Sequence, residues 1–154
     1  MKTGVIKHLE EKGHEIIKRE NYKTKEERKE LKKLLVTSDA FFMSSNAITL
    51  NGELVNVDGA GTRISYLING PEEVYIIAGM NKIVKDVDEA IARIKTIAAP
   101  INCVRLNKDT PCANIGICGN CLKDTICCHT LITRCNTQNK GRIKVFLVGE
   151  NLGY

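Results

Sequence analysis

The sequence predicts a three-layer α/β/α fold built on a mostly parallel sheet. Strand-like and helix-like segments alternate along the 154 residues. The segments 40–44 and 73–78 are almost continuously apolar, as expected for parallel strands that are buried on both faces. The chain has no Trp and only 5% aromatic residues, so the core must be mainly aliphatic. This length suits one domain, and we expect residues 1–154 to form it.

The first part of the chain carries two helix signals. Residues 5–12 predict a short helix that ends at Gly13. Thr24 and Glu27 match a capping box, which predicts a helix from Thr24 to about residue 36. Between these helices, residues 14–19 predict a strand.

The middle of the chain predicts a strand, a hairpin and a helix. The strand covers 40–44, and alternating apolar residues over 48–57 predict the hairpin. Asn51-Gly52 at its centre is typical of a type I′ turn. The Gly-rich turn 58–63 then opens a helix that ends at 69–71.

The second half begins with a strand over 73–78 that Gly79 ends. Residues 86–98 show the clearest helical periodicity. Three acidic residues lie in the first turn, where their charges interact favourably with the helix dipole. Three further strands are expected over 100–106, 130–135 and 143–148, the last two joined by a polar turn.

A cysteine-rich segment over about 107–129 interrupts this pattern, and we expect it to be a loop. It contains five of the seven cysteines. It has too few large apolar residues to fix one conformation by burial alone. A metal, disulfides or docking against the rest of the domain must therefore hold it. The spacing C-x5-C-x2-C-x5-C joins four thiols: Cys112, Cys118, Cys121 and Cys127.

Four thiolates can complete the tetrahedral shell of a zinc ion or hold an iron–sulfur cluster. The spacing matches neither the two-knuckle zinc pattern nor the compact ferredoxin pattern, so reduced structural or redox thiols and disulfides stay open as alternatives. Cys128 and His129 are possible substitute ligands. Cys103 and Cys135 fall in strand-like segments, where a buried, inert thiol is expected.

The sequence shows neither a signal peptide nor an apolar run of the roughly 20 residues that span a bilayer. We therefore expect a cytoplasmic protein without membrane contact, where clustered thiols indicate metal or redox chemistry before disulfides. The net charge of +5 raises the possibility of nucleic-acid binding. However, charges of both signs alternate over 25–30, which is typical of a solvated helix face, so nucleic acid is not the expected partner.

A candidate anion pocket lies around the Gly-rich turn. Asp58, Gly59, Gly61 and Arg63 precede or open a helix, whose N-terminus and arginine favour carboxylate or phosphate. An ordinary tight turn with Asp58 as N-cap is the alternative. Asn46 follows a predicted buried strand, a position where ligand sites gather in α/β sheets, although a polar loop residue is equally consistent.

The segment from Asn46 to Arg63 (NAITLNGELVNVDGAGTR) resembles the signature of the LUD domain, a family of lactate utilisation proteins (LutC/YkgG-like). The segments 74–86, 98–106 and 141–154 are similar to the same family. The cysteine-rich segment resembles a branch of small stand-alone members with the same four thiols.

This resemblance implies a NagB/RpiA/CoA-transferase-like fold and a role around the oxidation of lactate to pyruvate. Two departures accompany it. The usual Gly-Thr-Gly-Asn-Arg of the family is Gly-Ala-Gly-Thr-Arg over 59–63 here. The chain also begins inside the family's usual start, so a leading helix and strand are expected to be missing.

The sequence therefore predicts a protein of lactate or organic-acid utilisation that binds a small anionic metabolite and carries zinc or an iron–sulfur cluster. Whether it is an enzyme stays open. The alternative is a non-catalytic regulatory or assembly subunit with structural zinc or reduced thiols. In either case we expect a protein partner or a homo-oligomer.

Overall fold

A computed structural model describes residues 3–119, 121, 129–134 and 140–154. Its described strands form two sheets. The parallel sheet has the order β1 (Ala40–Met43), β4 (Glu73–Gly79), β7 (Ile143–Val148), with both neighbouring pairs parallel. The mixed sheet has the order β5 (Ile83–Val84), β2 (Ala47–Thr49), β3 (Leu54–Asp58), β6 (His129–Thr133). This is a mixed α/β fold with a parallel sheet, compatible with three α/β/α layers.

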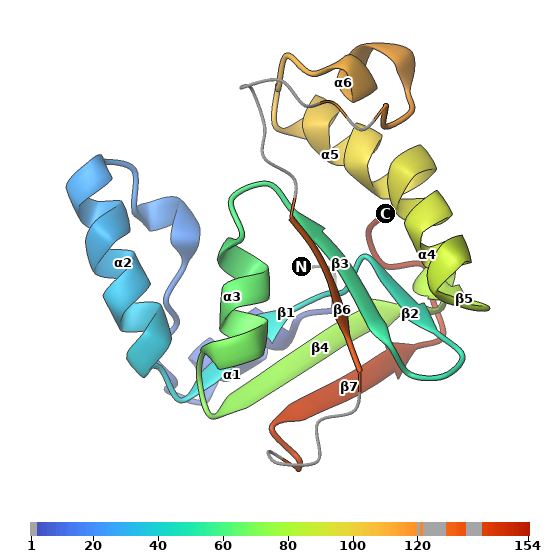
Figure 1. The fold of residues 1–154 in the computed structure, drawn as a ribbon. Helices are drawn as coiled ribbons and strands as arrows, with labels where there is room; N and C mark the ends of the chain where they lie inside the picture. Colours follow the sequence, from blue (N-terminus) through green and yellow to red (C-terminus); the bar gives the residue numbers. More distant parts are fainter. Residues whose placement is uncertain (1–2, 120, 122–128, 135–139) are drawn as a thin grey trace.

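The described helices are α1 (Val5–Glu11), α2 (Lys25–Thr37), α3 (Thr62–Asn69), α4 (Val87–Arg93), α5 (Ala99–Arg105) and α6 (Pro111–Ile115). Two short 3-10 helices, η1 (Arg19–Asn21) and η2 (Met80–Lys82), and a π-helical segment, η3 (Ile94–Ala98), accompany them. The helices α4 and α5 run along one side of the mixed sheet, and α6 lies at the far end of α5 (Figure 1).

Two hydrophobic clusters hold these layers together. The first lies between the two sheets and α3, and its buried members include Ile48, Leu67 and Ile76. The second lies between the mixed sheet and the α4–η3 helix, where Val55 and Ala90 have no exposed surface. Both clusters are mainly aliphatic, as the composition predicts.

Both helix N-termini that the sequence marks most clearly are confirmed. Thr24 accepts a hydrogen bond from the Glu27 N–H at 3.1 Å, and the Glu27 carboxylate accepts one from the Thr24 N–H at 2.8 Å. The Asp86 side chain caps α4 in the same way by accepting from the Glu89 N–H. Local hydrogen-bonding chemistry fixes such starts, so they can be predicted from sequence.

The predicted strand over 14–19 is wrong. Residues 14–18 have no regular structure, and η1 follows from Arg19. Ile16 and Ile17 are only half-buried, and no described strand pairs with this segment. A strand needs a partner for its backbone groups, and an apolar pair alone does not provide one.

The predicted strand over 100–106 is also wrong, because the preceding helix continues through it as α5. Pro100 is buried near the start of α5. A proline inside a helix removes one N–H and clashes with the carbonyl four residues earlier. The wider π-helical turn η3 immediately before it accommodates this defect, so the helix is not broken.

The hairpin is confirmed, but its turn is not type I′. A type I′ turn needs positive φ at both central residues. Here Gly52 has φ of 83° and Asn51 does not have positive φ. The Gly52 N–H donates to the Thr49 carbonyl at 2.9 Å, so the turn is centred on Leu50 and Asn51, and Gly52 adopts the left-handed conformation after it.

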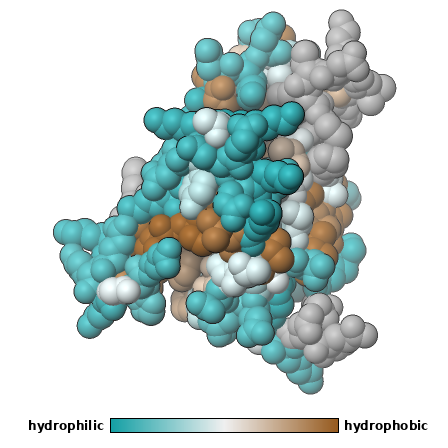
Figure 2. Space-filling view, turned by 90° about the vertical axis from the view of Figure 1, so that its left-hand side faces the viewer, coloured by the Kyte–Doolittle hydropathy of each residue, from teal (hydrophilic) through white to brown (hydrophobic). Residues whose placement is uncertain are grey.

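Two further expectations change. β1 is not enclosed on both faces: Phe41 packs against the first hydrophobic cluster, Phe42 points to the opposite face, and both rings are half-buried. The cysteine-rich segment is not only loop, because α6 forms at its start. The surface also retains much apolar area, and Figure 2 shows hydrophobic residues forming a continuous band across one side of the molecule.

Candidate functional site

The carboxyl ends of the three parallel strands bring three polar segments together. β1 leads into Ser44, Ser45 and Asn46, β4 leads into η2, and β7 leads into the C-terminal segment 149–154. The Lys82 ammonium donates to Ser44 Oγ at 3.0 Å, which joins the first two segments. The Leu152 N–H donates to Asn81 Oδ1 at 3.1 Å, which joins the third. Ligand sites of open α/β sheets form at this edge.

Lys82 is the central side chain of this edge and is only 6% exposed. Burial lowers the pKa of its ammonium to about 8, and the positive charges of Arg93 and Arg63 add to the effect. Among the described residues, no carboxylate acts on the pKa of Lys82 to raise it again, although Asp58 pairs with Arg63. A buried cation beside other cations is unfavourable unless an anion joins them.

Arg93 approaches the same edge from α4. It is 9% exposed, and burial lowers the pKa of its guanidinium. Its Nε donates to the Asn81 carbonyl at 3.1 Å and its Nη1 donates to the Asn46 carbonyl at 2.7 Å. Arg93 thus fixes the two strand-end loops relative to each other and leaves its positive charge near Lys82.

Arg63 is bound to its own loop. Its backbone N–H donates to Asp58 Oδ2 at 2.7 Å, its Nε to Asp58 Oδ1 at 3.4 Å and its Nη2 to the Val57 carbonyl at 2.8 Å. The Asp58 carboxylate therefore occupies the N-terminus of α3. Arg63 keeps a 34% exposed side chain, so its remaining donors can still reach a ligand.

The two glycines of the predicted pocket shape this turn. Gly61 precedes α3 with φ of 71°, a left-handed conformation that L side chains rarely adopt. Gly59 is exposed within the turn. The conformation of Gly61 allows the chain to fold back so that Asp58 reaches the Arg63 N–H.

Asn46 has a structural role in this arrangement. Its Oδ1 accepts from the Val57 N–H at 2.9 Å, and its own N–H donates to Asn56 Oδ1 at 3.1 Å. Asn56 is fully buried, and within the described part of the chain its side-chain NH₂ has no hydrogen-bond partner. The amide of Asn46 therefore holds the loop in place, and Asn56 has an unpaired donor.

The structure thus brings sequence-predicted Arg63 near two cations that sequence reasoning missed, Lys82 and Arg93. Lys82 follows a buried parallel strand directly through Gly79-Met80-Asn81, and that position was the available signal. Arg93 lies at the end of α4, close to its apolar residues. A single cation on the buried face of a helix indicates a structural or ligand-binding role. We call Lys82, Arg93 and Arg63 the cation cluster.

The thiols lie elsewhere, around α5 and α6. Cys112 is buried, and the Thr110 hydroxyl lies 3.3 Å from its Sγ. Cys118 and Cys121 are half-buried, whereas Cys127, Cys128 and Cys135 fall outside the described residues. His129 starts β6. The described residues contain no group of three or more His, Cys, Asp or Glu that could hold a metal ion.

Cys103 belongs to the same neighbourhood. It lies on α5 and is half-buried. Burial raises the pKa of its thiol, Thr110 lowers it by hydrogen bonding, and Cys112 and Cys118 raise it further. The helix that replaces the expected strand thus turns Cys103 toward two cysteines of the predicted set.

Comparison with known proteins gives one match. A sequence model of the LUD domain matches residues 1–148 of this chain. Neither the curated proteins nor the solved structures contain a significant match. Within the described residues, no helix has the length and apolar character needed to cross a membrane.

Proposed function

The chain belongs to the LUD domain family, and from that premise we propose that it binds a small anionic metabolite at the cation cluster. The observation that carries this proposal is the environment of Lys82. Its ammonium is almost completely buried, donates to Ser44 Oγ, and is acted on by the positive charges of Arg93 and Arg63, which lower its pKa. An anion at this position would remove the mutual repulsion of the three cations.

The chemistry of the cluster favours a carboxylate or phosphate. Guanidinium groups bind such planar or tetrahedral anions through paired N–H donors, and an ammonium adds a compact charge. Arg63 and Lys82 are the groups we expect to contact the ligand. Arg93 is expected to act at longer range, because two of its donors already bind backbone carbonyls.

We propose that the ligand belongs to organic-acid metabolism, with lactate and pyruvate as the first candidates. The family resemblance supports this choice, and it equally supports a NagB/RpiA/CoA-transferase-like arrangement of the parallel sheet. Both candidates carry one carboxylate. Asp58 already pairs with Arg63, so Lys82 and Arg93 leave two positive charges, one more than a single carboxylate balances. A second anionic group, as in a phosphorylated acid, would therefore fit better.

The test is isothermal titration of the protein with inorganic phosphate, acetate, L-lactate and pyruvate. Lys82→Met should lower the affinity for any bound anion at least about tenfold, because it removes a charged hydrogen-bond donor. Lys85→Met is the matched control, since Lys85 is an exposed lysine three residues along the same segment. Equal affinities for the two variants, or no binding of any anion by the unmodified protein, would refute the proposal.

We further propose that Cys112, Cys118, Cys121 and Cys127 bind one zinc ion or an iron–sulfur cluster. Thiolate is a suitable donor for both, and the proximity of Cys112 and Cys118 to Cys103 supports convergence of the sulfurs. An iron–sulfur cluster would supply electron transfer, and zinc would stabilise the segment. No coordination geometry follows, because the described residues do not contain a complete ligand group.

Elemental analysis of anaerobically purified protein tests the metal proposal. We expect about one zinc per chain, or iron together with visible absorption, and loss of the metal in Cys112→Ser. Protein that contains neither metal would leave reduced thiols, and the non-catalytic regulatory or assembly subunit would then be the better interpretation. The anion titration is independent of this result.

A further inference from the structure

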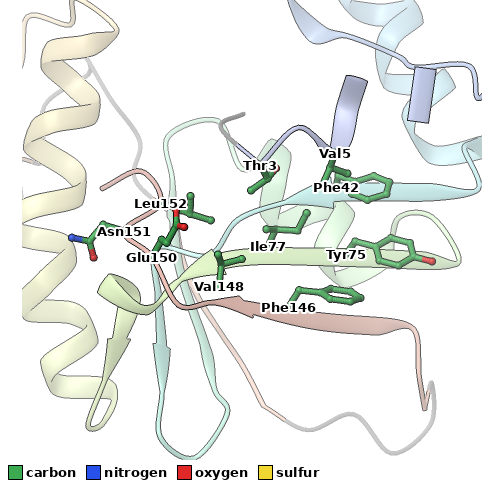
Figure 3. A pocket seen from close by; sticks show the side chains of 10 residues that line it. All are labelled: Thr3, Val5, Phe42, Tyr75, Ile77, Phe146, Val148, Glu150, Asn151 and Leu152. Atoms are coloured by element: carbon green, nitrogen blue, oxygen red, sulfur yellow. The ribbon is translucent and has the colours of Figure 1, made fainter. Parts of the chain in front are cut away.

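The two faces of the parallel sheet are covered unequally. The inner face packs into the cluster between the sheets. On the outer face, the rings of Phe42, Tyr75 and Phe146 lie in a row across β1, β4 and β7 (Figure 3). The ring centroids are 4.8 Å apart for Phe42 and Tyr75 and 6.2 Å apart for Tyr75 and Phe146. Together with Ile77, Val148 and Leu152 they line a hollow of about 700 Å³.

Among the described strands, β7 ends this sheet on one side, and it carries large apolar residues on both faces. Val145, Phe146 and Leu147 are 44%, 52% and 52% exposed. Successive residues of a strand point to opposite faces. Both faces of β7 therefore leave large apolar side chains half-exposed, which a single covering helix would not correct.

The backbone of β7 has a defined orientation. The Val74 N–H of β4 donates to the Arg142 carbonyl at 2.8 Å. In a parallel pair, the residues that bond to the neighbouring strand alternate with residues whose N–H and C=O point away from it. Val145 and Leu147 therefore direct their backbone groups to the outer edge of the described sheet.

The charged side chains Lys144 and Arg142 near this edge already have partners within one chain. Lys144 pairs with Glu73 at 2.5 Å and lies over the Tyr75 ring. Arg142 donates to the carbonyls of Tyr66, Leu67 and Pro71. Natural edge strands usually avoid pairing by carrying uncompensated charge, proline or a bulge. Residues 143–148 contain no proline, and the one charge among them is paired.

We propose that β7 pairs antiparallel with β7 of a second copy of this chain, so that the two parallel sheets join into one. The sequence of β7 favours pairing with an identical strand, because residues 145–148 are all apolar. On both faces of the joined sheet they would lie beside apolar side chains of the second copy. Pairing centred on Phe146 sets Lys144 beside Val148 of the second copy, so like charges do not oppose each other. A stable dimer needs about 800 Å² of buried surface on each partner, so the adjoining outer face must contribute with the strand.

Sedimentation equilibrium of the full chain tests this proposal between about 1 and 100 μM. The unmodified protein should form a dimer. Leu147→Lys should weaken the dimer at least about tenfold, because a two-fold contact brings two new charges into an apolar interface. Val36→Lys is the matched control, since Val36 is 54% exposed on α2, outside the parallel sheet, and its replacement should leave the dimer intact.

A second measurement uses only the unmodified protein, so it does not require any variant to fold. Amide hydrogen exchange of the unmodified protein should show Val145 and Leu147 protected at high concentration and more rapidly exchanged on dilution. A monomer at 100 μM, a dimer that Leu147→Lys does not weaken, or exchange at these two amides that ignores concentration would each overturn the proposal.

Discussion

The loop after β1 and the loop after β4 lie side by side, yet they treat buried polar groups in opposite ways. In the first loop, the Asn46 amide and backbone bind Val57, Asn56 and Arg93. In the second, Lys82 has one hydroxyl partner and two repelling cations. A satisfied buried group indicates structural support, whereas a buried charge without an opposite charge indicates a ligand. The pairing of a polar residue is thus more informative than its position near a strand end.

The largest effect should appear in the pH dependence of stability. The folded pKa of Lys82 is about 8, below its ordinary value of 10.5, so the folded state loses this proton before the unfolded state does. Between these values the unfolded state binds more protons, so the free energy of unfolding should rise with pH, by about 3 kcal/mol in total. Chemical denaturation at pH 7 to 10.5 measures it.

Lys82→Met provides the reference for that measurement, because other groups also titrate in this range. The rise from pH 8 to 10.5 should be smaller in Lys82→Met, and the variant should be more stable than the unmodified protein at pH 7. Saturating phosphate should flatten the rise in the unmodified protein, since a bound anion keeps Lys82 protonated. If the free energy of unfolding rose equally with pH in both proteins, the pKa of Lys82 would not be lowered by folding.

A smaller effect of the opposite sign is expected at Asn46. Asn46→Ala leaves the Val57 N–H without its acceptor and should lower the free energy of unfolding by about 2 kcal/mol. Asn21→Ala is the control, because Asn21 is exposed in η1. A loss of anion affinity without loss of stability in Asn46→Ala would assign this residue to the ligand and remove the contrast between the loops.

The smallest effect should come from a cap outside both loops. Thr24→Ala removes the acceptor for the Glu27 N–H at the start of α2 and should cost about 1 kcal/mol. Anion affinity should not change, because α2 contributes none of the site residues. Denaturant titration together with the phosphate titration checks both statements, and a loss of affinity would mean that α2 supports the site.

Residues close in sequence determined what could be predicted locally. The capping box at Thr24, the hairpin and the helix from Asp86 depend on neighbours within a few residues, and all are present. The segments 14–19 and 100–106 failed because a strand depends on a distant partner. The apolar pattern does not specify that partner, and the helix continues past Pro100 because the π-helical turn accommodates the proline.

The sequence by itself determined the aliphatic core, the alternation of helices and strands, the family and the presence of a basic residue in the Gly-rich turn. Only the tertiary structure decided that the charges of Arg93 and Arg63 act on Lys82, because α4 and the start of α3 reach the carboxyl ends of the parallel strands from distant parts of the chain. It also decided that β7 is a half-exposed end strand. Burial and charge repulsion are properties of that arrangement, so no single segment contains them.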